Sequence, residues 1–456
     1  MPGWKRTLRE SAGGAVLALC LALHGVPAVA VTLEDAMVTT YLTSSRLESG
    51  RDQLRQTDEL VPQALSGYRP NLFLNGSVEA VQGTVNTDST GVISNNRSGK
   101  ATTVQLRQNI YAGGGTQAAV SRAEHQVTAE RARLLGLEQQ VLLDAVDAYT
   151  AVYRDQEVLA LALNNEQRLQ RQLEATRDRF QVGEVARTDV AQAEARLARA
   201  RADVETAKAD LAASRALYRR VVGEEPRSLV QPLTLHALPS SSEEAEALAA
   251  NSPDVLAATF ALYAARDDVD VNFSTLLPSV DLQAEAGYAD QPTATTSWSR
   301  SAAVGVNVSI PLYQGGADYS RVRQSRQLVR QRRSELETTH RSVQEVVSAS
   351  WERLLAATAA IEAFKSEVRA NRIALEGVQQ EALVGSRTVL DVLDAQQELF
   401  TSQVNLVRAQ REEVVASYQL KLAVGQLTVS QLNLAVQPFD SQTYYNRQRT
   451  RLFGLD

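Results

Sequence analysis

Two aspartates and an arginine lie close together in the stretch VGSRTVLDVLDA, which runs from Val384 to Ala395. Asp391 and Asp394 are three residues apart, and this spacing places both carboxylates on one face of a helix. Arg387 precedes Asp391 by about one helical turn. Such a group could be a catalytic acid and base, a metal site, an ordinary solvated helix face, or a site of another kind.

Enzymatic chemistry finds little support in the rest of the chain. Four histidines are scattered along it: His24, His125, His236 and His340. No spacing of His, Glu and Asp resembles a metal site, and no serine lies in a nucleophile elbow. An acid and base pair would also need a cleft, which a helix tip does not offer. We therefore expect no enzyme activity, no cofactor and no metal.

The first thirty residues predict export. Basic residues precede an apolar run at 15–23, and Val26–Ala30 ends in the small-x-small pattern that signal peptidase cuts. The only cysteine, Cys20, lies within this segment, so we expect no disulfide in the mature chain. The formal net charge of −6 argues against nucleic acid as a partner. No later window approaches eighteen apolar residues, so any membrane-spanning part must consist of strands.

An internal duplication is the strongest pattern in the sequence. Equivalent residues are offset by 202 positions, and the offset holds without a gap from about residue 111 to residue 223: Tyr111 and Tyr313, Gly183 and Gly385, Asp189 and Asp391. A register kept this long indicates two copies of one unit. We assign residues 1–30 to a signal peptide, 31–223 and 224–425 to the two repeats, and 426–456 to a C-terminal collar segment and tail.

Each copy contains two segments in which apolar and polar residues alternate, which predicts β-hairpins at about 71–111 and 278–313. Each strand should run for about ten residues, the length that a tilted strand needs to cross a bilayer. The linkers at 83–99 and 289–300 are rich in Gly, Asn, Ser and Thr, which is typical of exposed loops. A soluble sandwich with one buried face is the alternative that alternation leaves open.

Long helical runs follow each hairpin, at 116–181 and 317–383, and shorter runs return at 189–222 and 391–424. They predict helical hairpins at about 115–223 and 316–425, each roughly 100 Å long. Small apolar residues at helical spacing predict coiled-coil-like seams, as at Val190, Ala193, Leu197, Ala200 and Val204. Residues 33–67, 224–275 and 426–456 contain shorter helical pieces and predict a separate collar. The polar sequence after Asp440 leaves the order of the tail undecided.

The connection between the two helices of each hairpin contains residues that typically end one helix and begin the next. Gly183 and Gly385 can adopt the left-handed conformation that closes a helix. Thr188 or Asp189 in the first copy, and Thr388 in the second, are expected to cap the returning helix.

The predicted strands imply an oligomer. Four strands cannot close a barrel, and an open sheet edge inside lipid leaves unsatisfied backbone groups. Two copies would supply eight strands, whose interior side chains fill, whereas three copies supply twelve and an open lumen. The expected assembly is a homotrimer or something larger, with its helical hairpins pooled into a hollow cylinder.

The tip sequences VGEVARTDVAQAEARL (Val182–Leu197) and VGSRTVLDVLDAQQEL (Val384–Leu399) resemble those of the TolC family of outer-membrane channel-tunnels. The strand-to-helix junctions agree with this resemblance: Tyr111, Gly113, Gly114, Tyr313, Gly315 and Gly316. The resemblance implies a mixed α and β membrane protein that forms a homotrimer. Its twelve-stranded β-barrel, with four strands from each chain, would sit in outer-membrane lipid and continue into a twelve-helix periplasmic α-barrel. The partners it implies are an inner-membrane transporter and a periplasmic adaptor.

The resemblance also implies roles for the charged cluster. Asp391 and Asp394 match aspartates that ring the periplasmic entrance, where stacked carboxylates attract cations. Arg387 matches an arginine that links neighbouring hairpins at the closed tip, with Thr188 and Asp189 as its partners. A tyrosine that often precedes this arginine is replaced by Ala382, so the link is expected to be weaker or differently arranged. The tip turns are the expected partner contact: Val182, Gly183, Val384 and Gly385.

Two functions compete within this family. The first is type I secretion of a protein or toxin with an ABC transporter, which the VLDVLDA sequence and the missing lipid-anchor cysteine favour. The second is efflux of small toxic molecules with a proton-driven pump. A soluble periplasmic coiled-coil adaptor is the alternative from a different class, and it has no need of apolar strand faces.

Overall fold

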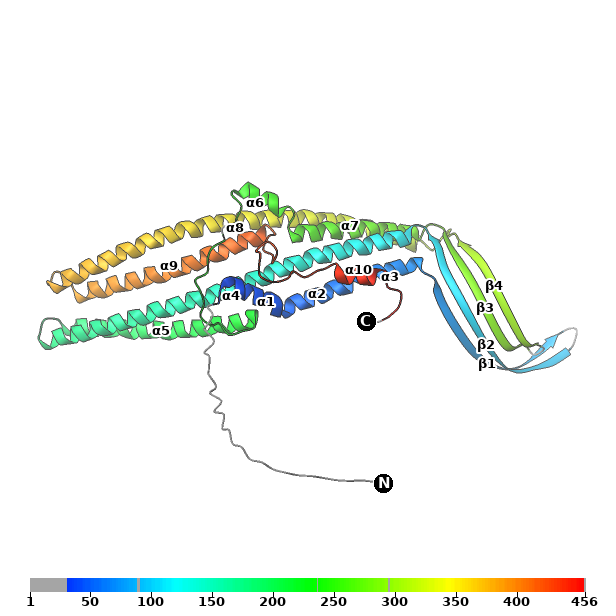
Figure 1. Ribbon diagram of the computed structural model, residues 1–456, viewed down its shortest axis with the longest axis horizontal. Coiled ribbons are helices and arrows are strands. Elements are labelled where there is room, and N and C mark those ends of the chain that lie inside the picture. Colours follow the sequence, from blue (N-terminus) through cyan, green and yellow to red (C-terminus); the bar gives the residue numbers. More distant parts are fainter. Residues whose placement is uncertain (1–30, 88–90, 236, 294–295, 455–456) are drawn as a thin grey trace, which may run out of the picture.

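The computed structural model describes residues 31–87, 91–235, 237–293 and 296–454, so the predicted signal peptide lies outside the described residues. The molecule is elongated, with a sheet at one end and long helices along the rest (Figure 1). Four helices form two hairpins: α4 (Gly115–Gln181) with α5 (Arg187–Val222), and α8 (Ala317–Leu383) with α9 (Val389–Ala423). These bounds confirm the predicted runs to within about two residues, as expected for proline-free sequence rich in helix formers. No helix in the described ranges is both long and apolar enough to cross a bilayer.

The sheet contains four antiparallel strands in the order β1-β2-β3-β4: β1 (Asn71–Thr87), β2 (Gly91–Ala112), β3 (Ser279–Thr293) and β4 (Thr296–Ser309). The strands are longer than predicted, because the sequence expected to form loops is paired in both hairpins. Gly83 pairs with Asn95, for example, and Ala289 pairs with Ser299. Cross-strand hydrogen bonding holds these polar stretches extended despite their loop-like composition. The tips of both hairpins, at 88–90 and 294–295, lie outside the described residues.

Pairing of β2 with β3 joins the two predicted hairpins into one sheet. The described residues leave its apolar side chains uncovered, since Leu72, Leu74, Val78, Val304 and Val306 are between 65% and 77% exposed. A soluble sandwich would need a second sheet against this face, and the described residues form only one. The sandwich alternative is therefore wrong.

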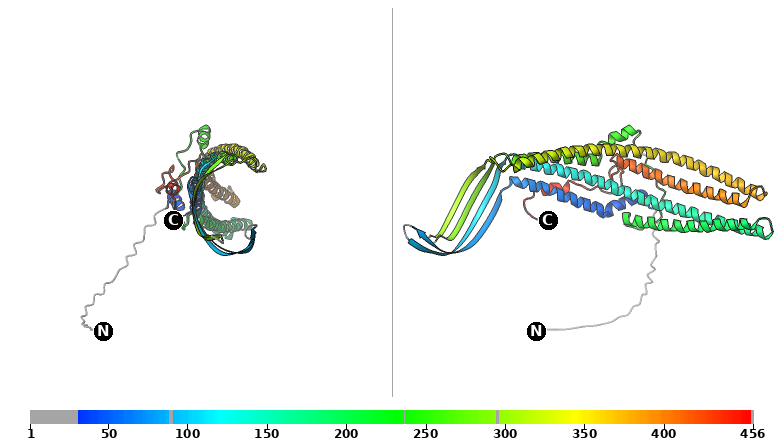
Figure 2. Two further views of the ribbon diagram at one scale, coloured as in Figure 1. Left: turned by 90° about the vertical axis from the view of Figure 1, so that its right-hand side faces the viewer. Right: turned by 180° about the vertical axis from the view of Figure 1, so that it is seen from behind.

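The remaining helices lie along the wall between the middle of the molecule and the sheet: α1 (Leu33–Thr43), α2 (Ser45–Asp58), α3 (Leu60–Leu65), the 3₁₀ turn η1 (Ser66–Tyr68), α6 (Ser242–Ala249), α7 (Pro253–Ser274) and α10 (Thr443–Arg449). Helix α7 is shorter than the hairpin helices, as predicted, but at 22 residues it packs between α4 and α8 as part of the wall and does not form a separate collar piece. Seen end on, the sheet and helices follow one curved wall (Figure 2).

The main core lies where α1, α4, α5 and α9 meet. Tyr149 is fully buried there, and its hydroxyl lies 2.8 Å from the Val31 carbonyl oxygen while it accepts a hydrogen bond from the Val230 N–H at 2.9 Å. This contact fixes the first described residues against the wall. After Asp440 the described chain forms α10, which is held against the wall because Tyr444 donates to Glu59 and Arg449 pairs with Glu124, each at 2.7 Å.

Asp58 lies at the end of α2, and its carboxyl group is buried. It is 1% exposed, and neither oxygen has a hydrogen-bond partner within the described chain. Burial raises the pKa of Asp58 to about 6, although the positive charge of Arg131 opposes that rise. The buried Arg131 guanidinium also lies over the Tyr445 ring of α10, 4.9 Å from its centroid. The charged form of Asp58 is therefore the costly one.

This predicts that the protein becomes less stable as pH rises from about 4 to about 6. The unfolded chain, with an Asp pKa near 3.9, has already lost the proton that folded Asp58 still holds, so deprotonation penalises only the folded state. The penalty is about 3 kcal/mol and is fully present above about pH 7. Thermal unfolding at pH 4.5 and pH 7 should show a larger loss for wild type than for Asp58→Asn. The exposed Asp52, on the same helix, supplies the control Asp52→Asn, which should behave as wild type.

Candidate functional site

The two helical hairpins end together at the far end of the molecule from the sheet (Figure 1). Gly183 and Gly385 have φ of 81° and 80°, which confirms the left-handed turns. No atom lies within 4 Å of a Cβ built on either glycine, so conformation and not packing requires glycine here. Val182 and Val384 stand beside the turns and are 71% and 80% exposed. The tip thus presents apolar side chains that nothing in the described chain covers.

Thr388 caps helix α9, as predicted. Its hydroxyl accepts from the Asp391 N–H at 3.2 Å, while the Asp391 carboxylate accepts from the Thr388 N–H at 2.9 Å and from its hydroxyl at 2.8 Å. These hydrogen bonds to the charged form lower the pKa of the Asp391 carboxyl. Asp391 is therefore a charged member of a capping box, fixed in place by its own helix end.

The predicted cap of α5 was wrong. Its N-cap is Ala186, and neither Thr188 nor Asp189 occupies that position. Asp189 instead accepts a hydrogen bond from the Ala186 N–H at 3.0 Å, which is half of the arrangement that Asp391 makes. Ala186 lies 202 positions before Thr388, so the two copies keep one geometry and differ only in the missing hydroxyl.

Arg387 pairs within its own hairpin. Its Nε lies 2.8 Å from Oε2 of Glu381, and both side chains are 51% exposed. Within the described chain it makes no contact with Thr188 or Asp189 that would link the two hairpins. The predicted link from Arg387 to Thr188 and Asp189 of a neighbouring hairpin stays a prediction.

Asp394 forms an ion pair that the sequence did not suggest. Its Oδ1 contacts Nη2 of Arg196, which projects from α5 of the other hairpin. Comparison of the two repeats gives one indication of this ion pair. Residues 192 and 196 are Gln and Arg in the first repeat, whereas the equivalent residues of the second repeat are Asp394 and Glu398. The change of charge between copies marks a position where the hairpins can attract each other.

An apolar cluster, the tip core, joins the hairpins beneath these charges. Leu169 and Leu173 of α4 and Ala193, Leu197 and Ala200 of α5 pack around Val389 and Leu393 of α9. The predicted seam of α5 is thereby confirmed, since four of its five residues are buried and Val190 is partly buried against the same cluster. The second hairpin packs against the first through this cluster, and Leu393 is only 1% exposed.

The strand-to-helix junctions also contain left-handed glycines. Gly113 and Gly114 have φ of 61° and 80°, and Gly315 and Gly316 have φ of 65° and 81°. Tyr111 lies in β2, whereas Tyr313 follows the end of β4 and is 79% exposed. At each junction two consecutive left-handed glycines turn the chain from strand into helix.

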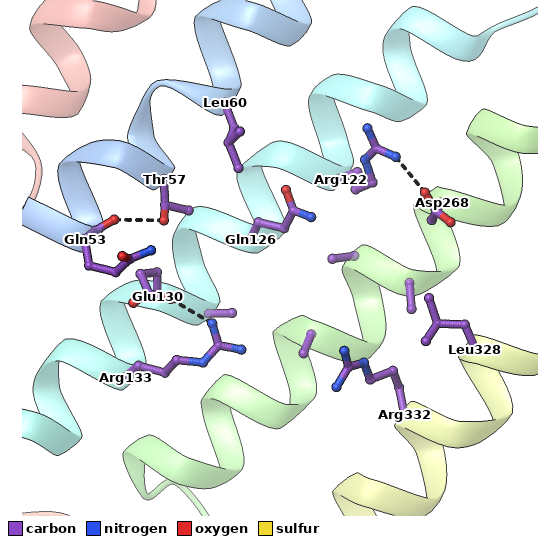
Figure 3. Close-up of a pocket in the computed structure, with 14 residues that line it drawn as sticks. Gln53, Thr57, Leu60, Arg122, Gln126, Glu130, Arg133, Asp268, Leu328 and Arg332 are labelled. Carbon is purple, nitrogen blue, oxygen red and sulfur yellow. Dashed lines mark hydrogen bonds and ion pairs between the residues drawn. The ribbon is translucent and has the colours of Figure 1, made fainter. Parts of the chain in front are cut away.

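A cleft of about 410 Å³ lies between α2, α3, α4, α7 and α8, far from the tip (Figure 3). Its charged side chains are already paired: Arg122 with Asp268 at 2.6 Å, Arg133 with Glu130 at 2.7 Å, and Arg332 with Glu335 at 2.7 Å. No group of three or more His, Asp or Glu side chains in the described ranges could hold a metal ion. The cleft therefore offers ion pairs and no free reactive group.

Comparison with known proteins agrees with this architecture. The family described as outer membrane efflux protein matches residues 42–224 and 245–426. BepC of Brucella suis, described as an outer membrane efflux protein, is 37% identical over 99% of this chain and 97% of its own length. TolC of Vibrio cholerae is 29% identical over 67% of this chain and 72% of TolC.

Two further comparisons cover most of the chain. The alkaline protease secretion protein AprF of Pseudomonas aeruginosa is 26% identical over 70% of this chain and 68% of AprF. The solved structure of the Campylobacter jejuni CmeC outer membrane channel matches with a TM-score of 0.78 at 15% identity, covering 92% of this chain and 89% of CmeC.

The predicted fold class is confirmed, because one chain supplies four strands and two long helical hairpins to the wall of a channel-tunnel. The soluble adaptor alternative is wrong, since the family match covers both repeats and the apolar sheet face is uncovered. The protein belongs to the outer membrane efflux protein family, resembles TolC as its tip sequences indicated, and resides in the outer membrane with a periplasmic tunnel.

Proposed function

We propose that this protein is the outer-membrane conduit of a tripartite export machine, in which a periplasmic adaptor and an inner-membrane transporter deliver cargo to the helical tip. The observation that carries the proposal is the continuous curved wall. An uncovered apolar sheet leads through left-handed glycine turns into helices of 67 residues, each roughly 100 Å long. Such a wall reaches from the outer membrane far into the periplasm. The ion-paired cleft gives no reason to propose catalysis.

Three copies would close this wall. In the single chain β1 and β4 each have one unpaired edge, and such edges are not tolerated in lipid. Pairing β4 of one protomer with β1 of the next satisfies both, and twelve strands leave an open lumen. Crosslinking of cysteines placed on facing residues of β1 and β4 should yield a covalent trimer. If the largest crosslinked species is a dimer, this proposal is contradicted.

Two cargo classes are supported by different relatives. Similarity to BepC over nearly the whole chain supports efflux of small molecules through a proton-driven pump. Similarity to AprF supports type I secretion of a polypeptide with an ABC transporter, which the tip sequence also favoured. A deletion strain separates them. Lower tolerance of toxic compounds would indicate efflux, and loss of one secreted polypeptide would indicate secretion. A deletion strain that shows neither change would contradict an export role.

The tip should act as a gate with acidic rings. In planar bilayers we expect low conductance for wild type and several-fold higher conductance for Arg387→Ser, because that change removes a cation able to link neighbouring hairpins. Asp391→Asn with Asp394→Asn should weaken block by multivalent cations. Asn is preferred to Ala at 391 because it can still accept the capping hydrogen bond from Thr388. Unchanged conductance and unchanged block in these variants would contradict the assigned roles.

A further inference from the structure

The two carboxylates of the proposed entrance stand in different environments. Asp391 is bound to the end of its own helix through both donors of Thr388, and no cation of the described chain pairs with it within ion-pair distance. Asp394, one turn later, contacts the guanidinium of Arg196. The side chain of Asp394 is 53% exposed and that of Arg196 is 29% exposed, so solvent and passing ions can reach this pair.

Packing of the hairpins holds this pair together. Leu197, next to Arg196, and Leu393, next to Asp394, are both buried in the tip core. The backbones that carry the two charges are thus fixed relative to each other by apolar contacts. Because Arg196 belongs to the first repeat and Asp394 to the second, the pair forms only while the hairpins stay packed.

We propose that Arg196 determines the ion selectivity of the entrance by neutralising Asp394. In the packed tip each chain then presents the charge of Asp391 without that of Asp394, so the acidic ring is about half as charged as the sequence suggests. Separation of α5 from α9 would release Asp394 and increase the attraction for cations. This inference rests on the proposed function as a channel.

Charge arithmetic gives the inference a sharp test. Arg196→Gln uncovers one negative charge per chain, and Asp394→Asn uncovers one positive charge. The first should make the channel more cation-selective and more sensitive to hexaamminecobalt added at the tip side, and the second should do the opposite. The double variant restores neutrality and should return both properties to those of wild type. The readouts are the reversal potential in a KCl gradient and the concentration for half block.

Another ion pair near the tip supplies the matched control. Arg177 of α4 and Glu194 of α5 are 2.7 Å apart, and their side chains are 51% and 50% exposed. Both belong to the first hairpin, so Arg177→Gln also uncovers one negative charge per chain, that of Glu194, but leaves the pair between Arg196 and Asp394 in place. We expect Arg177→Gln to shift reversal potential and block much less than Arg196→Gln does, because Glu194 is not part of the proposed acidic ring. Arg196→Lys, which keeps the charge, should also resemble wild type and guards against loss of folding in Arg196→Gln.

The outcomes separate this inference from the proposed function. If wild type forms channels and Arg196→Gln leaves selectivity and block unchanged, the inference is overturned and the channel function stands. The inference is equally overturned if the double variant keeps the shift of Asp394→Asn, because Arg196 would then not compensate that charge. If purified wild type forms no channel in bilayers, the proposed function itself fails.

Discussion

Gly113→Ala should remove most of the assembled channel from the outer membrane. Gly113 has φ of +61°, which costs an L-residue about 1–2 kcal/mol. A Cβ at this position would also lie 2.7 Å from Cβ of Leu277 and 2.8 Å from the carbonyl oxygen of Ser274. Neither neighbour can rotate away, because one atom belongs to backbone and the other is attached directly to it. The change would push the start of α4 away from the end of α7.

That displacement matters because the same point joins the two repeats. Ala112, next to Gly113, pairs with Ser279 where β2 meets β3. Gly385→Ala is the matched control, since Gly385 has φ of +80° but no atom within 4 Å of an added Cβ. The measurement is the amount of heat-resistant oligomer in outer-membrane fractions. Equal yields from Gly113→Ala and Gly385→Ala would show that close packing at the junction is unimportant.

The helices could be predicted closely because their information is local. Absence of proline and a high content of helix formers set α4 and α8, and the glycines of each turn set where they end. The length of the strands was underestimated, because Gly- and Asn-rich segments that have the composition of loops are paired with a neighbouring strand. The cap of α5 was misplaced because Ala186 carries no capping side chain, and the register with Thr388 was the better guide.

The charged site was predicted only in part because its contacts are non-local. The capping role of Thr388 follows from sequence, and it also explains the position of Asp391 three residues later. The pair between Arg196 and Asp394 joins helices 198 positions apart in the chain. It depends on how two coiled hairpins pack side by side, which neither helix encodes alone. The only sign of this pair in the sequence is the difference in charge at equivalent positions of the two repeats.

Leu393→Ala should loosen the closed tip and raise channel conductance. Leu393 is the most deeply buried leucine of the tip core, a cluster that includes residues from both helices of the first hairpin. Truncation of a buried leucine costs about 2–5 kcal/mol, because transfer energy is lost and a cavity remains. If an open tip already lacks these contacts, a cost of about 3 kcal/mol shifts the closed-to-open equilibrium by roughly a hundredfold.

Single-channel recording in planar bilayers measures that shift as a higher open fraction. Leu390→Ala is the control, since Leu390 lies one turn earlier on α9 but is 38% exposed and outside the tip core. Its open fraction should stay near that of wild type. The Asp394 charge should also become more accessible in Leu393→Ala, because unpacking the hairpins separates it from Arg196. If the open fraction rises without greater cation selectivity, the entrance opens while Arg196 and Asp394 stay paired. That result would mean that opening does not separate α5 from α9 at this ion pair.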